Sequence, residues 1–490
     1  NSAYNSPIRS RFSGVDIEKV DKRTVRFHLS KSYVPFKNLL TFGILPEKLW
    51  MQIPASSANL AELNLKPVGS GPYKFQSLVK DKKGNIRTYN LTKNKKYYKN
   101  NPYIEEISFK FFVNHTEATN SLNENKIDGI GYLPLSTEND LASQNSLRIH
   151  GLLLPKINSI FFNQENNPAL KDKSVREALA YGINREKIVN NILGGNAELV
   201  NSPLPKTSYA YNSQVTKYGH NISKAKQKLK EAGWEKMSVS EKDVKEIKDK
   251  KESLQNDQGQ NEDNKQDIEE EQEDSESNNN TPSEEGGAEK EELTLQEKIK
   301  LQLGAGTWLR KPREEEGFQY LNIEVSAVDK SINRDIVKKI KEQWEKMGVK
   351  TTVRMVPMNE FNSKVVKTRD FEALFHSQVV DDEIDTYAYW HSSQTGSSGL
   401  NISNYQNEKV DEILKQVRSL TDKKERVNKY KEFQEIVAKD IPAIFLYSPE
   451  LLYVQSKKIK GFDIQNIKSP EDRFSNISDW YIKTEEEIVW

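Results

Sequence analysis

The densest group of residues that could take part in chemistry lies between His376 and Tyr405. A predicted strand, Glu372–Val380, leads directly into several carboxylates, and aromatic rings and a Ser/Gly-rich loop follow them. Carboxylates beside aromatic faces at the end of a strand are typical of sites that recognise a cationic or amphipathic ligand. We therefore predict a ligand-binding site here, with these contact residues: Asp382, Asp385, Tyr387, Trp390 and Asn401.

A second interpretation of the two acids needs no ligand. Asp382 and Asp385 could cap the helix or turn that follows, because an aspartate side chain accepts backbone N–H groups at the start of a helix. His376 and His391 flank the same acidic turn. They could hold a metal ion, but two polar histidines at the ends of a strand or loop are the simpler interpretation.

Composition and motifs exclude several classes of function. The chain has no cysteine, so thiolate catalysis and cysteine-based metal sites are absent. The motifs G-x-S-x-G, H-E-x-x-H and G-x-x-x-x-G-K-[ST] do not occur in the sequence. The 73 Lys and Arg residues balance the 72 Asp and Glu residues. We therefore expect no catalytic residue, no metal, no cofactor and no nucleic-acid partner.

The elements around this group indicate an α/β fold. "SVREALAYGINREKIVNNILGG" predicts one helix, with Ser174 and Glu177 as a capping box and Gly194 and Gly195 as its stop. From there to Ile444, helical and strand patterns alternate, as in an α/β lobe. The amphipathic stretch 408–447 is predicted to be scaffold without site chemistry.

Eight blocks of this sequence follow the order found in one family. Together they resemble the extracellular solute-binding proteins of family 5, the oligopeptide/dipeptide-binding proteins of ABC transporters. The blocks are "VDKRTVRFHLSKSYVPF" (20–36), "PVGSGPYKF" (67–75), "LTKNKKYYKNNPYIEEISFKFF" (91–112), the helix from Ser174 with its preceding strand, "KAKQKLKEAGW" (224–234), "IKEQWEKMGVKTTVRMV" (340–356), "FLYSPELLYVQSKKIKGF" (445–462) and "NISDWY" (476–481).

The resemblance implies a particular architecture. It is a two-lobed, periplasmic-binding-protein-like (class II) clamshell of α/β class, with two hinge crossings. Residues 1–157 would be the remaining part of lobe one, 158–444 lobe two, and 445–490 the second hinge and the return to lobe one. The resemblance also implies that the family's N-terminal part is missing, so we expect the chain to fold poorly alone.

The family also implies a function. The chain is expected to be the substrate-binding component of an ABC importer, capturing a peptide-like solute and delivering it to permease subunits. It would act as a monomer outside the cytoplasm, in the periplasm or at the cell surface, held to the membrane by an anchor upstream of this chain. The alternatives are a sensor, a chaperone or a surface adhesin on the same scaffold, or a hydrolase.

In the peptide-binding family, an aspartate after the strand at 372–380 pairs with the ligand's α-ammonium group. The family spacing D-x-x-D/E-P places Asp382 on the first acid and Asp385 on the second. Two departures from this pattern leave sugars, metal chelates and other solutes open as ligands. Thr386 replaces the proline, and Val379 stands where a tryptophan often precedes the first acid.

Residues 239–298 interrupt lobe two. They are rich in charged and amide side chains and nearly free of large apolar ones. Such a segment buries too little apolar area to offset the entropy of ordering, so we predict a disordered acidic insert. A calcium ion or a cationic partner is the alternative explanation.

Overall fold

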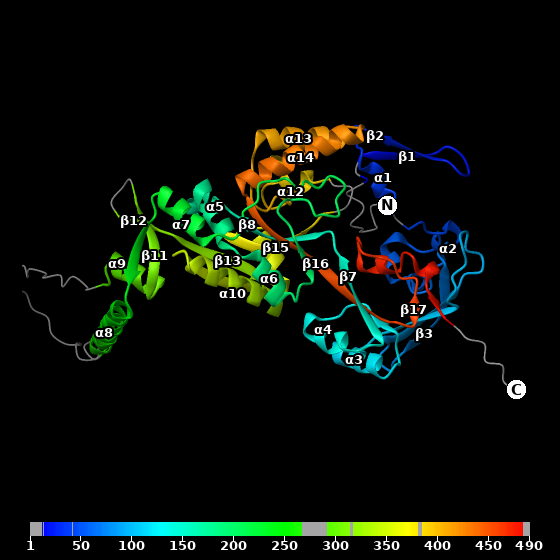
Figure 1. Ribbon diagram of the computed structural model, residues 1–490, viewed down its shortest axis with the longest axis horizontal. Coiled ribbons are helices and arrows are strands. Elements are labelled where there is room, and N and C mark those ends of the chain that lie inside the picture. Colours follow the sequence, from blue (N-terminus) through cyan, green and yellow to red (C-terminus); the bar gives the residue numbers. More distant parts are fainter. Residues whose placement is uncertain are drawn as a thin grey trace, which may run out of the picture.

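The computed structural model describes residue 12 and residues 14–41, 43–266, 292–313, 317–380 and 385–483. The molecule is elongated and has two lobes joined near its middle (Figure 1). Helices cover a mixed β-sheet in the larger lobe, whereas the smaller lobe contains several small sheets. This arrangement confirms the predicted two-lobed α/β class.

One sheet organises the larger lobe, with strand order β14-β13-β15-β8-β16-β6. Its strands in this lobe are β8 (Lys156–Phe162), β13 (Asn322–Val328), β14 (Lys350–Val356), β15 (Ala373–Val379) and β16 (Ala443–Ser456). Strands β14, β13 and β15 are parallel, and β8 and β16 continue the sheet in antiparallel register. Parallel neighbours need long crossovers, and helices supply them between these strands.

Helices pack over both faces of this sheet. The first core includes side chains from α5 (Lys173–Gly182), α6 (Arg185–Ile192), α7 (Ile222–Glu231) and α10 (Ser331–Glu345). The second includes side chains from α11 (Met358–Phe361), α12 (Tyr387–Trp390), α13 (Glu408–Ser419) and α14 (Lys423–Asp440). Along β8, Ile160 and Phe162 enter the first core and Ile157 and Phe161 the second, because successive strand side chains face opposite ways.

Two neighbouring stretches of the central sheet carry the chain between the lobes. Strand β7 (Leu147–Leu153) pairs with the second half of β16, whereas β8 and β9 (Ala197–Leu199) pair with its first half. The register with β8 shifts between Phe445 and Tyr447. One crossing is therefore the middle of β16, and the other is the short connection from β7 to β8 beside it. The domain boundaries predicted at 157/158 and 444/445 fall within β8 and β16 and remain predictions.

The smaller lobe has its own sheets and cores. Its elements are β3 (Tyr73–Lys80), β4 (Ile86–Lys93), β5 (Glu106–Lys110), α3 (His115–Asn123), β6 (Gly129–Ile130), α4 (Leu135–Ala142), β17 (Ile459–Lys460) and β18 (Tyr481–Ile482). Leu122, Leu141 and Val454 share one core, and Tyr453 and Trp480 share another. The second half of β16 contributes to both cores and so ties the lobe to the hinge.

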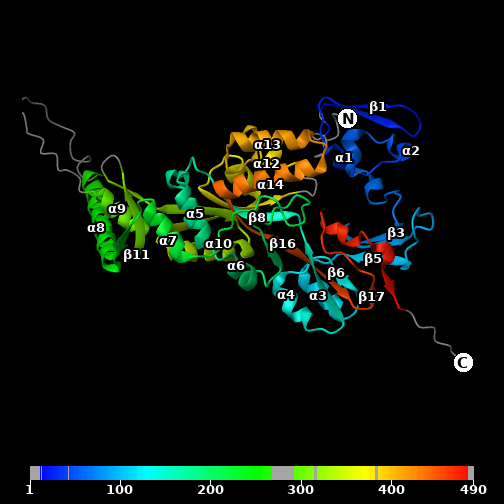
Figure 2. The same ribbon diagram turned by 45° about the horizontal axis from the view of Figure 1, so that its top comes forward.

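An N-terminal segment reaches across to the larger lobe. It contains β1 (Val15–Lys19), β2 (Val25–Leu29), α1 (Phe36–Leu39) and α2 (Glu47–Trp50). The β1–β2 hairpin and α1 lie beside one end of α13, in views that differ by 45° (Figures 1 and 2). The chain then runs through α2 to β3 in the smaller lobe.

The helix predicted from Ser174 is two helices. Asp172, not Ser174, caps α5, and its side chain accepts the Ser174 N–H at 2.8 Å. Helix α5 ends at Gly182. Asn184 then caps α6, because its side chain accepts the N–H of Lys187 at 2.9 Å. Each helix therefore starts at an Asx side chain, a residue type strongly preferred at the N-cap. Gly194 and Gly195 have positive φ, as expected for a helix stop.

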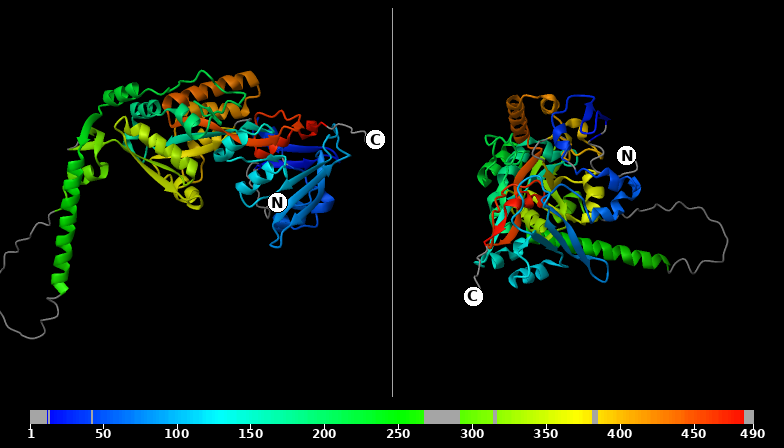
Figure 3. Two further views of the ribbon diagram at one scale, coloured as in Figure 1. Left: turned by 60° about the horizontal axis from the view of Figure 1, so that its bottom comes forward. Right: turned by 90° about the vertical axis from the view of Figure 1, so that its right-hand side faces the viewer.

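The prediction that residues 239–298 form a disordered insert is wrong at both ends of that range, where the structure has helices. Helix α8 (Glu241–Gln266) and helix α9 (Leu295–Leu303) adjoin a sheet of β10 (Glu235–Val239), β11 (Gly306–Pro312) and β12 (Phe318–Tyr320) at the far end of the larger lobe (Figure 3). Ser240 and Asp243 exchange hydrogen bonds at the start of α8, and Ile247 is buried. Lys250 pairs with Glu297 across the two helices at 3.2 Å. Residues 267–291 lie outside the described residues.

Candidate functional site

Asp385 is the described acid of the predicted site, and protein groups already satisfy it. Its Oδ2 accepts the Tyr33 hydroxyl at 2.8 Å and pairs with Arg418 at 3.2 Å. Its Oδ1 accepts the backbone N–H of Tyr387 at 3.3 Å. The last contact closes a turn before α12, whose own N-cap residue, Thr386, has no side-chain cap. With its charge paired and both oxygens bonded, Asp385 has little capacity left for a cationic ligand.

Arg418 lies at the C-terminal end of α13 and is close to two aromatic rings. Its guanidinium carbon is 5.0 Å from the ring centre of Tyr33 and 4.4 Å from that of Tyr387. A guanidinium over an aromatic face is attracted by the ring's quadrupole, and partial burial strengthens that attraction. Arg418 thus joins the N-terminal segment, the residues after the acidic turn and α13.

Tyr33 remains a hydrogen-bond donor at neutral pH. Burial, together with the negative charge of Asp385, raises the pKa of its hydroxyl to about 12. The hydroxyl therefore keeps its proton and donates a hydrogen bond to the carboxylate. Such a bond is charge-assisted.

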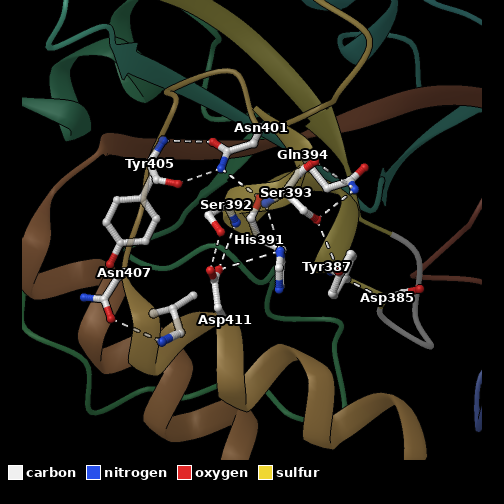
Figure 4. Close-up of polar contacts among 11 residues, drawn as sticks. Asp385, Tyr387, His391, Ser392, Ser393, Gln394, Asn401, Tyr405, Asn407 and Asp411 are labelled. Carbon is white, nitrogen blue, oxygen red and sulfur yellow. Dashed lines mark hydrogen bonds and ion pairs between the residues drawn. The ribbon is translucent and has the colours of Figure 1, made fainter. Parts of the chain in front are cut away.

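Tyr387 continues the network toward α13 (Figure 4). Its ring stacks on the His391 ring, with centroids 4.1 Å apart, and its hydroxyl lies 3.1 Å from the Ser393 hydroxyl. His391 Nδ1 accepts the backbone N–H of Ser393 at 3.0 Å. Burial lowers the pKa of His391, against the opposing effect of Asp411. The imidazole is therefore held neutral, as an acceptor at Nδ1.

Asn401 and Trp390 belong to the scaffold beneath this network. Asn401 is 0% exposed, donates to the carbonyls of His391 and Tyr405, and accepts the Tyr405 N–H (Figure 4). Trp390 is 1% exposed and packs against the rings of Phe161, Tyr405 and Phe445. Neither side chain has a surface that a solute could contact here. We therefore correct both assignments from ligand contact to structural support.

The five predicted contact residues thus separate into three groups. Asp385 and Tyr387 lie together in one network, and Trp390 and Asn401 are buried below it. Asp382 lies outside the described residues, so its role as a ligand contact stays a prediction. Tyr33 and Arg418 complete the network and were missed. Arg418 belongs to the amphipathic stretch that was predicted to carry no site chemistry, and Tyr33 is 352 residues from Asp385.

The two histidines near the acidic turn do not meet. His376 lies on β15 beside the Phe361 ring, whereas the nearest acid to His391 is Asp411, at 3.8 Å. Among the residues that the structure describes, no three His, Cys, Asp or Glu side chains are grouped so that they could hold a metal ion.

Comparison with known proteins decides the family. Residues 1–276 of the 490 match the model of the bacterial extracellular solute-binding proteins, family 5 Middle. The chain belongs to this family. Its members are extracytoplasmic solute-binding proteins, and the resemblance seen in the eight sequence blocks is confirmed.

One relative matches this family 5 chain over nearly its whole length, and another matches about half of it. The oligopeptide-binding protein AppA of Bacillus subtilis is 25% identical over 494 residues, which covers 98% of this chain and 76% of AppA. The dipeptide-binding protein of Escherichia coli is 27% identical over 226 residues, which covers 45% of this chain and 41% of that protein.

Solved structures share the fold of this family 5 chain. AppA from Bacillus subtilis in complex with a nonapeptide has a TM-score of 0.62 and 23% identity, covering 99% of this chain and 81% of AppA. A putative peptide-binding protein AppA from Clostridium difficile has a TM-score of 0.72 and 18% identity, covering 99% and 82%. Within the described ranges, no helix is both long enough and apolar enough to cross a membrane.

Proposed function

We propose that this chain is the substrate-binding component of an ABC importer, and that it captures a peptide-like solute between its lobes and delivers it to a membrane permease. The family membership supports a solute-binding role. The similarity to an oligopeptide-binding protein over 98% of the chain supports a peptide as the solute.

The observation that carries this proposal is the pair of adjacent crossings between the lobes. Strand β16 runs through both lobes, and the β7–β8 connection lies beside it. Two neighbouring connections let two rigid lobes rotate about one axis without breaking either core. A chain that opens and closes in this way can enclose a solute and release it.

Three further points belong to the proposal. The chain acts as a carrier that releases its solute unchanged, not as an enzyme. It works as a monomer that docks on permease subunits. It is associated with the membrane while its lobes face the extracytoplasmic space.

Asp382 is the proposed partner of the ligand's ammonium group. Asp385 already forms an ion pair with Arg418 and accepts hydrogen bonds from the Tyr33 hydroxyl and the Tyr387 N–H. Its proposed role is therefore to support Asp382. An unpaired carboxylate is needed to meet a desolvated ammonium group, and removing one partner of such a pair costs roughly 2–5 kcal/mol.

Titration calorimetry tests this proposal. The 490-residue chain is titrated with an equimolar library of synthetic nonapeptides that have free amino ends, and then with the same library N-acetylated. Mass spectrometry afterwards checks that the peptides are intact. We expect Asp382→Asn to weaken binding of the free-amino library at least about tenfold, or 1.4 kcal/mol, and to leave the acetylated library nearly unaffected.

Each result has a separate meaning. If the chain unfolds cooperatively on heating, and is therefore folded, yet binds neither library, peptide capture is wrong. Cleaved peptides would contradict a carrier. An equal loss of affinity for both libraries would mean that Asp382 does not contact the ammonium group, and the peptide is then held elsewhere.

A further inference from the structure

The N-terminal segment contacts the candidate site through two neighbouring residues. The Tyr33 hydroxyl donates to Asp385, and the backbone N–H of Val34 donates to the carbonyl oxygen of Arg418 at 2.8 Å. One contact meets the residues after the acidic turn, and the other meets the end of α13. Together they fix the segment to the larger lobe at a defined register.

The other end of this segment is fixed to the smaller lobe. The hydroxyl of Tyr89 on β4 donates to the carbonyl oxygen of Leu65 at 2.7 Å. Between the two attachments Phe36 is buried, whereas Ile44 is 88% and Leu60 90% exposed. Residues 33–41 and 43–65 therefore form a connection, here called the strap, from one lobe to the other, separate from the two strand crossings (Figures 1 and 2).

Tyr33 matters to the strap because the Arg418 guanidinium beside it has few other hydrogen-bond partners. The guanidinium pairs with Asp385 through one terminal nitrogen, while its Nε is buried and has no hydrogen-bond partner in the described part of the structure. The rings of Tyr33 and Tyr387 both contact it. Removal of the Tyr33 hydroxyl would leave Asp385 with one donor fewer and loosen the Arg418 contact.

We propose that Tyr33 is a positioning residue that acts through Asp385 and Arg418, holding the strap against the larger lobe and thereby slowing release of the solute bound between the lobes. The second half of this statement rests on the proposed function. When the lobes part, the strap either detaches at Tyr33 or is stretched along its exposed length. In both cases the hydroxyl bond opposes opening.

The test compares two tyrosines that differ only in what they join. Tyr33→Phe removes a 2.8 Å bond between the strap and the larger lobe. Tyr73→Phe removes a bond of 2.8 Å to Ile104, inside the smaller lobe. Hydrogen exchange of the full chain is followed by mass spectrometry. We expect Tyr33→Phe to speed exchange about three- to tenfold in residues 33–40 and 385–391, and Tyr73→Phe to leave both regions unchanged.

A second readout concerns release of solute. Stopped-flow dissociation of the free-amino nonapeptide library should be about three- to tenfold faster from Tyr33→Phe, with the association rate unchanged, because the lost bond opposes the parting of the lobes that releases the solute. Combining Tyr33→Phe with Arg418→Gln should add less than the sum of the single effects, since both act through Asp385.

Three outcomes would overturn the proposal. One is unchanged exchange and unchanged release in Tyr33→Phe. Another is an equal effect of Tyr73→Phe on residues 33–40. The third is full additivity of the two substitutions. If the library fails to bind the unmodified chain, the proposed function fails instead, and the exchange experiment alone still decides whether Tyr33 holds the strap.

Discussion

At the scale of residues, buried polar groups hold the candidate site in shape. Asn401 makes three hydrogen bonds from a fully buried position, and each buried group left without a partner costs about 1–3 kcal/mol. We expect Asn401→Ala to lower the free energy of unfolding by about 2–4 kcal/mol. Gln394→Ala is the control, because that half-buried side chain bonds, within the described part of the chain, to the adjacent Ser393 alone. Urea denaturation measures both, and equal stabilities would show that Asn401 has no supporting role.

His376 gives the fold a dependence on pH. Burial, with a smaller contribution from the charge of Lys156, lowers its pKa to about 4, whereas an unfolded histidine titrates near 6.5. As the pH falls from 6.5 to 4, the unfolded chain binds a proton that the folded chain does not. Stability contributed by the neutral ring is therefore complete above pH 6.5 and is lost below it, at about 1.4 kcal/mol per pH unit.

We expect His376→Gln to flatten this loss of stability between pH 6.5 and 4. His220→Gln, at an exposed position, should keep the slope of the unmodified chain. Thermal or urea unfolding across the pH range measures the difference. The same slope in both variants would mean that other groups cause the acid sensitivity.

The residues of the candidate site were predictable only where neighbours in sequence are neighbours in space. Asp385 and Tyr387 follow one strand, so their pattern placed them together correctly. Tyr33 and Arg418 come from distant segments, and a local pattern holds no information on which segments pack together. Trp390 shows a second limit, since an aromatic beside acids can face a ligand or the core, and only the packing of α12 against the sheet decides between the two.

At the scale of elements, local signals placed most helices and strands of the larger lobe but not their ends. The predicted helix from Ser174 contains a break at Gly182 because Asn184 offers a new cap inside the apolar pattern. The predicted insert failed for a different reason. Few apolar residues are present, but Val239, Leu303 and Trp308 form a small core that α8 and α9 share with β10 and β11. Average composition conceals such a core.

Helix α8 supplies a prediction at this scale. Ile247→Asp places a charge at a buried position of α8, so hydrogen exchange should rise in residues 241–254 while the central sheet stays protected. Lys245→Asp adds the same side chain on the exposed side of the same helix and should change little. Similar protection in both variants would contradict packing of α8 against its neighbours.

At the scale of the whole molecule, the two lobes and their crossings determine what the chain can do. Alternating helix and strand patterns predicted the larger lobe from physical principles alone. The smaller lobe has weak patterns, because none of the residues of β3, β4 and β5 is fully buried, and there the family resemblance supplied the architecture. The strap was not predictable, since its exposed apolar residues read as an ordinary loop.

The central claim is that the lobes close on a peptide. Since the chain has no cysteine, paired spin labels can be introduced cleanly. Thr116→Cys on α3 and Lys338→Cys on α10 report the distance between lobes, and Lys338→Cys with Lys230→Cys on α7 is the control within one lobe. Double electron–electron resonance should show a shorter distance between lobes when the free-amino nonapeptide library is added, and an unchanged distance within the larger lobe. A library that binds while both distances stay the same would contradict the account.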